Sequence, residues 1–147
     1  MSENNNVERL LAPERAVFLA TSDEKGRPNV RAMAVVTHEG LKTLWMMTGK
    51  ACDKSRELAK NPHCHIYATD LEDMENYLEL RLWGTMEMLD DPDSRAFAWR
   101  DDYLRYFPGG KDDPGLVVLK FTADSGMVQT QAGKKEIALY TVRGPKL

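Results

Sequence analysis

Residues 29–54 read NVRAMAVVTHEGLKTLWMMTGKACDK, two short apolar runs followed by a charged stretch. The two runs are typical of short strands, and Glu39-Gly40 between them is a turn signal. Four polar side chains lie close together beside these apolar runs: Arg31, Thr48, Lys50 and Lys54. Cations and hydroxyls donate hydrogen bonds to phosphate, while apolar strand faces cover a flat ring. The stretch therefore predicts a site for a phosphate attached to an apolar ring.

The first of these strands, expected over Asn29–His38, alternates between two faces. We expect its smaller set of side chains to line the interior of a tight barrel; this set is Val30, Ala32, Ala34 and Val36. The next strand is expected over Leu41–Thr48, and Gly49 ends it. A helix is then predicted over Asp53–Lys60, because the proline of Asn61-Pro62 cannot continue a helix.

Hydrophobic periodicity predicts further elements on both sides of this stretch. The other expected strands cover Ala16–Ser22, His63–Thr69, Tyr77–Leu89, Leu116–Phe121, Gly126–Gln131 and Ile137–Val142. The first three strands are expected to form an antiparallel meander. A short amphipathic helix is expected over Val7–Glu14, and one or two helices over Ser94–Phe107. Gly84 inside a strand indicates a bulge, which helps a barrel to close. The predicted fold class is α+β dominated by β, a small antiparallel barrel of six or seven strands with short flanking helices.

Length and composition restrict the function classes. The 147 residues predict one domain over 1–147, with no linker or repeat. The longest apolar runs fall far short of the roughly 20 residues of a membrane span, so no membrane partner is expected. A net charge of −3 argues against nucleic-acid binding. The polar start of the chain and two cysteines expected to be free thiols favour a cytoplasmic location.

Three motifs occur in a fixed order: R-x-M from Arg31, W-x-x-T-G-K from Trp45, and K-x-x-x-L-x-x-N-P from Lys54. Their order and spacing resemble the FMN-binding split barrel of the pyridoxamine-5′-phosphate-oxidase-like superfamily. Within it, the chain is most similar to the small general-stress-protein branch. The likeness covers about 16–121, so the predicted barrel becomes a split barrel.

The resemblance implies a homodimer with flavin at the subunit interface. It places Arg31 and the residues after it along the ring and phosphate, Thr48 at the ribityl phosphate, and Lys54 at the phosphate itself. Glu79 falls at a ring-contacting position reached from the partner subunit. The residues expected to bind FMN are Arg31, Ala32, Met33, Ala34, Trp45, Met47, Thr48, Lys50, Lys54 and Glu79.

The chain also departs from the oxidases. Asp53 stands where the oxidases carry an arginine, and Val36 stands where they carry a lysine. Lys50 is expected to supply the missing positive charge. The terminal IALYTVRGPKL lacks the tryptophan and the arginine-containing segment with which the oxidases finish. True pyridoxamine phosphate oxidase activity is therefore not expected.

The favoured function is an FMN-dependent oxidoreductase of a small substrate, with NADH or NADPH as a donor. The alternatives are a flavin-binding stress or sensor protein without committed catalysis, and a related barrel that binds haem or a deazaflavin. In a further interpretation, Arg31, Lys50 and Lys54 are solvated surface charges. Trp45, Met46 and Met47 are then simply part of the core. An aromatic set is expected to pack on the barrel or the dimer partner, with one member over the flavin: Phe97, Trp99, Tyr103, Tyr106 and Phe107.

No metal site is expected. In a strand, His63 and His65 share one face while Cys64 points to the other, so at most two ligands converge. A structural zinc site needs four.

Overall fold

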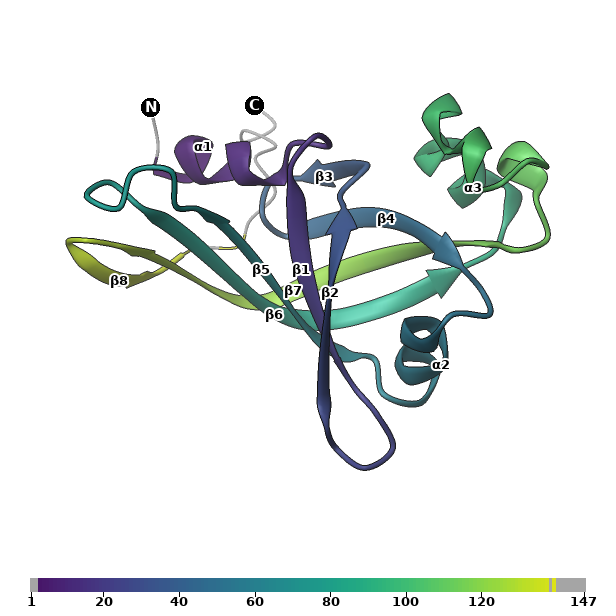
Figure 1. The fold of residues 1–147 in the computed structure, drawn as a ribbon, viewed down its shortest axis with the longest axis horizontal. Helices are drawn as coiled ribbons and strands as arrows, with labels where there is room; N and C mark the ends of the chain where they lie inside the picture. Colours follow the sequence, from purple (N-terminus) through teal and green to yellow (C-terminus); the bar gives the residue numbers. More distant parts are fainter. Residues whose placement is uncertain (1–2, 138, 140–147) are drawn as a thin grey trace, which may run out of the picture.

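The architecture is a curled antiparallel sheet, and the computed structural model describes residues 3–137 and 139 of it. Seven strands follow the order β2-β1-β5-β6-β7-β4-β3, and an eighth, β8, pairs with β7 beside this path. Their bounds are β1 (Ala16–Ser22), β2 (Pro28–Ala34), β3 (Thr37–Glu39), β4 (Thr43–Gly49), β5 (His63–Asp70), β6 (Leu78–Leu89), β7 (Leu116–Thr130) and β8 (Gly133–Glu136). The end strands β2 and β3 are joined by only two residues, so the sheet must curl back on itself (Figure 1). The predicted split barrel is confirmed.

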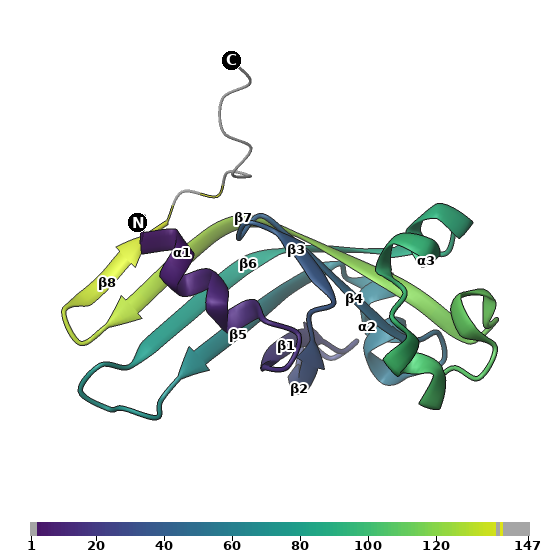
Figure 2. The ribbon, with the colours of Figure 1, turned by 90° about the horizontal axis from the view of Figure 1, so that it is seen from above.

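Short helices lie around this sheet (Figure 2). They are α1 (Glu3–Glu8), η1 (Arg9–Leu11), α2 (Asp53–Lys60), α3 (Pro92–Ala98), η2 (Asp101–Arg105) and η3 (Gly110–Asp112). Asp91 begins α3, because its side chain accepts a hydrogen bond from the Ser94 backbone N–H at 3.0 Å. Within residues 3–137 and 139, no helix is long and apolar enough to cross a membrane.

Two groups of buried side chains hold the fold together. The larger fills the barrel interior and includes Val17, Leu19 and Phe121, all with 0% exposure. The smaller lies where α3 and the segment after it pack on β4 and β7, and it consists of Val36, Trp45, Met47, Ala98, Leu116 and Val118. This second group places η2 beside the ends of β2 and β4.

The predicted inward face of β2 is wrong. Val30 is 64% exposed, and Ala32 is also exposed. Arg31 pairs in register with the fully buried Leu19, so Arg31 and Met33 turn toward the interior instead. Alternation predicts which residues share a face, and the neighbours of the strand then decide which face is inside.

The strand pairing also differs from the prediction. Asn29–His38 is not one strand, because the chain leaves β2 after Ala34 and starts β3 at Thr37. The expected meander of three strands is wrong, since β4 pairs with β7 rather than with β2. The two short strands expected over 116–131 are one strand, β7. The bulge expected at Gly84 is confirmed by a register shift between Trp83 and Gly84.

The helices agree with the prediction in α2 but differ from it near the start of the chain. The helix over Asp53–Lys60 is confirmed as α2. The helix expected over Val7–Glu14 is wrong in its bounds, because helical structure already begins at Glu3 and ends at Leu11, before Pro13. The one or two helices expected over Ser94–Phe107 are α3, which already begins at Pro92, and η2. Most of the strand expected over Ile137–Val142 lies outside the described residues.

Candidate cofactor-binding site

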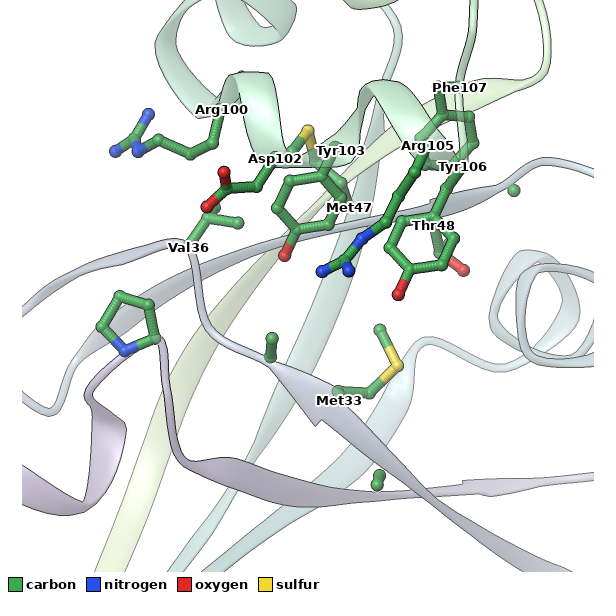
Figure 3. A pocket seen from close by; sticks show the side chains of 14 residues that line it. Met33, Val36, Met47, Thr48, Arg100, Asp102, Tyr103, Arg105, Tyr106 and Phe107 are labelled. Carbon is green, nitrogen blue, oxygen red and sulfur yellow. The ribbon is translucent and has the colours of Figure 1, made fainter.

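A cavity of about 550 Å³ lies between the ends of β2 and β4 and the segment 100–107 (Figure 3). This volume is within the usual range of small-molecule sites. Three parts of the chain contribute lining residues, namely Ala32, Met33, Ala34 and Val36; Met47, Thr48 and Gly49; and Arg100, Asp102, Tyr103, Arg105, Tyr106 and Phe107, together with Pro13. The wall on the strand side is mostly small or apolar, and the opposite wall is aromatic and charged.

A buried arginine anchors the segment that forms the second wall. The Arg95 guanidinium donates hydrogen bonds to the backbone oxygens of Lys111, Asp113 and Leu116, and to the Asp90 carboxylate. Its side chain is only 8% exposed. Because these partners come from both ends of the loop and from β7, Arg95 fixes the loop against the sheet.

The side chains of the second wall point across the cavity. In Figure 3, the Tyr103 hydroxyl and the Arg105 guanidinium point from η2 toward Met33. The Arg105 guanidinium carbon lies 5.0 Å from the centre of the Tyr106 ring, a cation–π contact. Burial raises the pKa of Tyr103, and neighbouring Tyr106 adds to the rise. Tyr103 is therefore a neutral hydrogen-bond donor at physiological pH.

A chain of polar contacts leads from Thr48 in the cavity wall to α2. The Thr48 Oγ1 lies 3.6 Å from Cys52 Sγ, and the Lys54 Nζ lies 3.4 Å from the same sulfur. Burial alone raises the pKa of Cys52, but hydrogen bonds with Ser55 and Thr48 and the Lys54 charge lower it to about 7. An ammonium and a hydroxyl thus both contact one thiol, which lies one contact away from the cavity wall.

Five of the ten residues expected to bind the cofactor line the cavity: Ala32, Met33, Ala34, Met47 and Thr48. They come from two strands that do not pair with each other. Only the curl of the sheet brings them together.

The other five do not line it. Arg31 pairs with Glu57 at 3.2 Å, and Lys50 pairs with Asp90 at 2.6 Å. Trp45 packs edge-on against Phe97 with a ring separation of 5.0 Å, so it belongs to the second buried group. Glu79 accepts a hydrogen bond from the Tyr67 hydroxyl on the outer face of the sheet. Lys54 reaches the cavity edge only through Cys52.

Sequence reasoning missed two arginines of the cavity wall, Arg100 and Arg105. The aromatic set had indicated this segment, and the expected packing of Trp99, Tyr103 and Phe107 on the barrel is confirmed. The spacing could have indicated Arg100: Arg100, Tyr103 and Tyr106 recur every three residues, and in a 3₁₀ turn such residues share a face. Arg105 does not follow this spacing, and no local signal points to it. Among residues 3–137 and 139, no group of three or more potential metal ligands comes together.

Three comparisons with known proteins agree with this fold. Residues 4–129 match the family model described as pyridoxamine 5′-phosphate oxidase. General stress protein 26 of Bacillus subtilis (strain 168) is 30% identical over 118 residues, which cover 79% of this chain and 81% of that protein. A crystal structure of a protein related to general stress protein 26, from Clostridium acetobutylicum, is 30% identical with a TM-score of 0.82, covering 92% of this chain and 94% of that one.

A solved F420 reductase is also similar. It is 26% identical with a TM-score of 0.59, and the match covers 81% of this chain and 94% of that one. The family model spans most of the chain, and the Bacillus subtilis and Clostridium acetobutylicum proteins of the general stress protein 26 type are each 30% identical to it. This protein therefore belongs to the pyridoxamine 5′-phosphate oxidase family, in its general-stress-protein branch.

Proposed function

We propose that this protein binds FMN in the cavity between β2, β4 and η2 and acts as an oxidoreductase on a small substrate. The observation that carries the proposal is the arrangement of the two walls. Small side chains at the end of β2 lie opposite an aromatic and basic segment, with the Thr48 hydroxyl between them. Family membership makes a flavin the first candidate for this cavity.

The residues present suit FMN. Ala32 and Ala34 leave room for a flat ring to approach the backbone of β2, and Tyr103 and Tyr106 offer aromatic surface opposite them. Thr48 and Lys54 are suitable donors for the phosphate, because hydroxyl and ammonium groups both hydrogen-bond to its oxygens. When bound, FMN supplies the electron-transfer chemistry, while the chain orients it and excludes water.

A homodimer is supported by the outer face of the sheet. Strand register places two rows of side chains side by side on this face: Val30, Ala20, His65 and Trp83 in one row, and Ala32, Phe18, Tyr67 and Arg81 in the next. Phe18, Val30 and Trp83 are 39%, 64% and 39% exposed. Ala32 belongs both to this face and to the cavity wall. A second copy bound here would therefore border the flavin site.

Arg105 favours an anionic electron donor such as NADH or NADPH. Within residues 3–137 and 139 its guanidinium forms no ion pair, and it faces the cavity beside Tyr106. A guanidinium without a carboxylate partner next to the ring site attracts the phosphates of a nicotinamide nucleotide.

The first test is the visible spectrum of the purified protein, followed by extraction and mass measurement of the cofactor. A flavin spectrum with the mass of FMN supports the proposal; haem, a deazaflavin or no chromophore overturns it. Anaerobic addition of NADH or NADPH then tests catalysis. Bleaching of the flavin supports the oxidoreductase, whereas a flavin that neither donor reduces indicates the alternative, a flavin-binding stress or sensor protein.

Lys54→Ala tests the phosphate end of the site. Loss of one charge-assisted hydrogen bond is expected to weaken FMN binding about 10- to 100-fold. Lys60→Ala is the matched control, because Lys60 lies on the same helix and pairs with Glu24 away from the cavity. Equal FMN affinity in both variants and the wild type would contradict the assignment.

Sedimentation tests the dimer, and a flavin-loaded monomer would rule out an interface site.

A further inference from the structure

Arg31, expected from the sequence to be a phosphate ligand, has a different set of partners in the structure. Its Nη1 donates to the Thr21 hydroxyl at 2.6 Å and to the backbone oxygens of Leu19 and Asn29. Its Nη2 donates to Glu57 Oε2 at 3.2 Å. The side chains of Arg31 and Glu57 are 23% and 12% exposed. The guanidinium is therefore neutralised and hydrogen-bonded inside the barrel, away from the cavity.

Glu57 is the centre of this network. Its carboxylate accepts hydrogen bonds from Thr21 at 2.5 Å and from Asn29 at 2.6 Å, in addition to Arg31. The Thr21 hydroxyl, helped by Asn29 and Arg31, lowers the pKa of Glu57 against the opposing effect of burial. Three donors from β1 and β2 thus converge on one carboxylate of α2.

The network ties α2 to the hairpin of β1 and β2. A helix of eight residues has little stability of its own, so tertiary contacts must hold it. At its start, the Ser55 hydroxyl donates to the Gly49 oxygen at 2.7 Å, and Glu57 ties its middle to the β1–β2 hairpin. Lys54 and Glu57 are three residues apart and share one face of the helix. A shift of the Glu57 side therefore moves the Lys54 ammonium relative to Thr48.

We propose that Arg31 and Glu57 are positioning residues for the flavin phosphate: their ion pair fixes α2 on the β1–β2 hairpin and so holds Lys54 near Thr48, and Arg31 does not contact the phosphate itself. This inference rests on the proposed FMN binding. It reassigns a residue that the resemblance placed on the ligand, and it gives Glu57 a role that the sequence did not indicate.

The test compares the affinities of FMN and riboflavin, which differ only in the phosphate. The dissociation constant of riboflavin divided by that of FMN, called the ratio below, measures what the phosphate contributes to binding. In Arg31→Met and in Glu57→Gln, the ratio is expected to fall about 3- to 10-fold, because Lys54 loses part of its contact. The double variant is expected to lose no more than either single one, since the two residues act as a unit. In a Lys54→Ala background, neither substitution is expected to change the ratio further.

Arg27→Met is the matched control. Arg27 pairs with Asp23 in the same hairpin, at 69% exposure, without contact to α2. It is expected to leave the ratio unchanged. Urea denaturation of every variant ensures that the affinities are measured on folded protein.

Three results would overturn the inference. If Arg31→Met lowers the ratio while Glu57→Gln leaves it unchanged or raises it, Arg31 is a direct ligand, because Glu57→Gln frees its guanidinium. If neither variant changes the ratio, the pair has only a structural role. If the wild type binds neither FMN nor riboflavin, the proposed function fails as well, which separates that outcome from the first two.

Discussion

The Lys54 ammonium lies 3.4 Å from the sulfur of Cys52, at the start of α2 and one contact away from Thr48 in the cavity wall. This contact joins the cation expected to bind phosphate to a thiol whose pKa is lowered to about 7. The pair makes the edge of the cavity sensitive to pH in the physiological range.

Cys52 is expected to react with iodoacetamide with a rate that rises as the pH passes through about 7, because only the thiolate is nucleophilic. In Lys54→Met the midpoint should rise only slightly, since the hydrogen bonds with Ser55 and Thr48 lower the pKa more than the Lys54 charge does and both remain. Burial raises the pKa of Cys64 to about 12, so it should stay unmodified in the folded protein. Mass spectrometry of the labelled peptides measures both sites, and a wild-type midpoint near 9 would disprove the effect of these contacts.

Arg105→Ala is expected to slow flavin reduction by NADPH about tenfold more than reduction by N-benzyl-1,4-dihydronicotinamide, which has no phosphate. The reason is that a single charge-assisted hydrogen bond contributes about 1.5–3 kcal/mol. Stopped-flow absorbance of the flavin under anaerobic conditions measures both rates. Arg56→Ala is the control, because Arg56 pairs with Asp53 on an exposed helix face. An equal effect on the two donors would show that Arg105 does not recognise the phosphates.

Gly84→Ala is expected to destabilise the fold by about 1–3 kcal/mol, because the added methyl group has no space. A Cβ at Gly84 would lie 2.1 Å from the Thr122 oxygen and 2.9 Å from Ala123 Cα, both backbone atoms of β7. At Gly49 the nearest atom is 3.9 Å away, so Gly49→Ala is the control for the loss of a glycine. Urea denaturation followed by tryptophan fluorescence compares the two, and similar midpoints would show that the bulge relaxes without cost.

Arg95→Met is expected to lower the free energy of unfolding by roughly 2–4 kcal/mol, because several buried backbone oxygens lose their donor. It should also loosen the loop between α3 and β7 and so weaken the second wall of the cavity. Limited proteolysis is expected to cut the variant within 100–115 faster than the wild type. Thermal unfolding supplies the stability, and a normal cleavage pattern with normal stability would contradict the anchoring role.

Some elements follow from local sequence alone. The bounds of α2 were predictable because Gly49 ends the preceding strand and Asn61-Pro62 stops the helix. The bulge at Gly84 was predictable because a glycine inside an alternating strand often marks a bulge or a close backbone approach. The residues of the cavity wall from β2 and β4 were named because their motifs resemble those of a known family.

The face of β2 that turns inward was decided only by the tertiary structure. Alternation determines that Arg31 and Met33 share a face, but it does not determine the side of the sheet on which they lie. That choice depends on Leu19 across the ladder and on Glu57, which is 26 residues away in sequence and accepts the Arg31 hydrogen bond.

The second wall of the cavity was also decided only by the tertiary structure. Aromatic residues after Asp91 indicate packing, yet nothing local says that Arg105 will line the same cavity as Thr48. The buried Arg95 brings Lys111, Asp113 and Leu116 together and so folds the segment back onto the sheet. The sequence by itself determined the family and some of the elements, such as α2 and the bulge at Gly84, because periodicity, turn residues and motifs act over a few neighbours. The tertiary structure decided which cations face the cavity, because a buried charge lies where a distant partner can neutralise it.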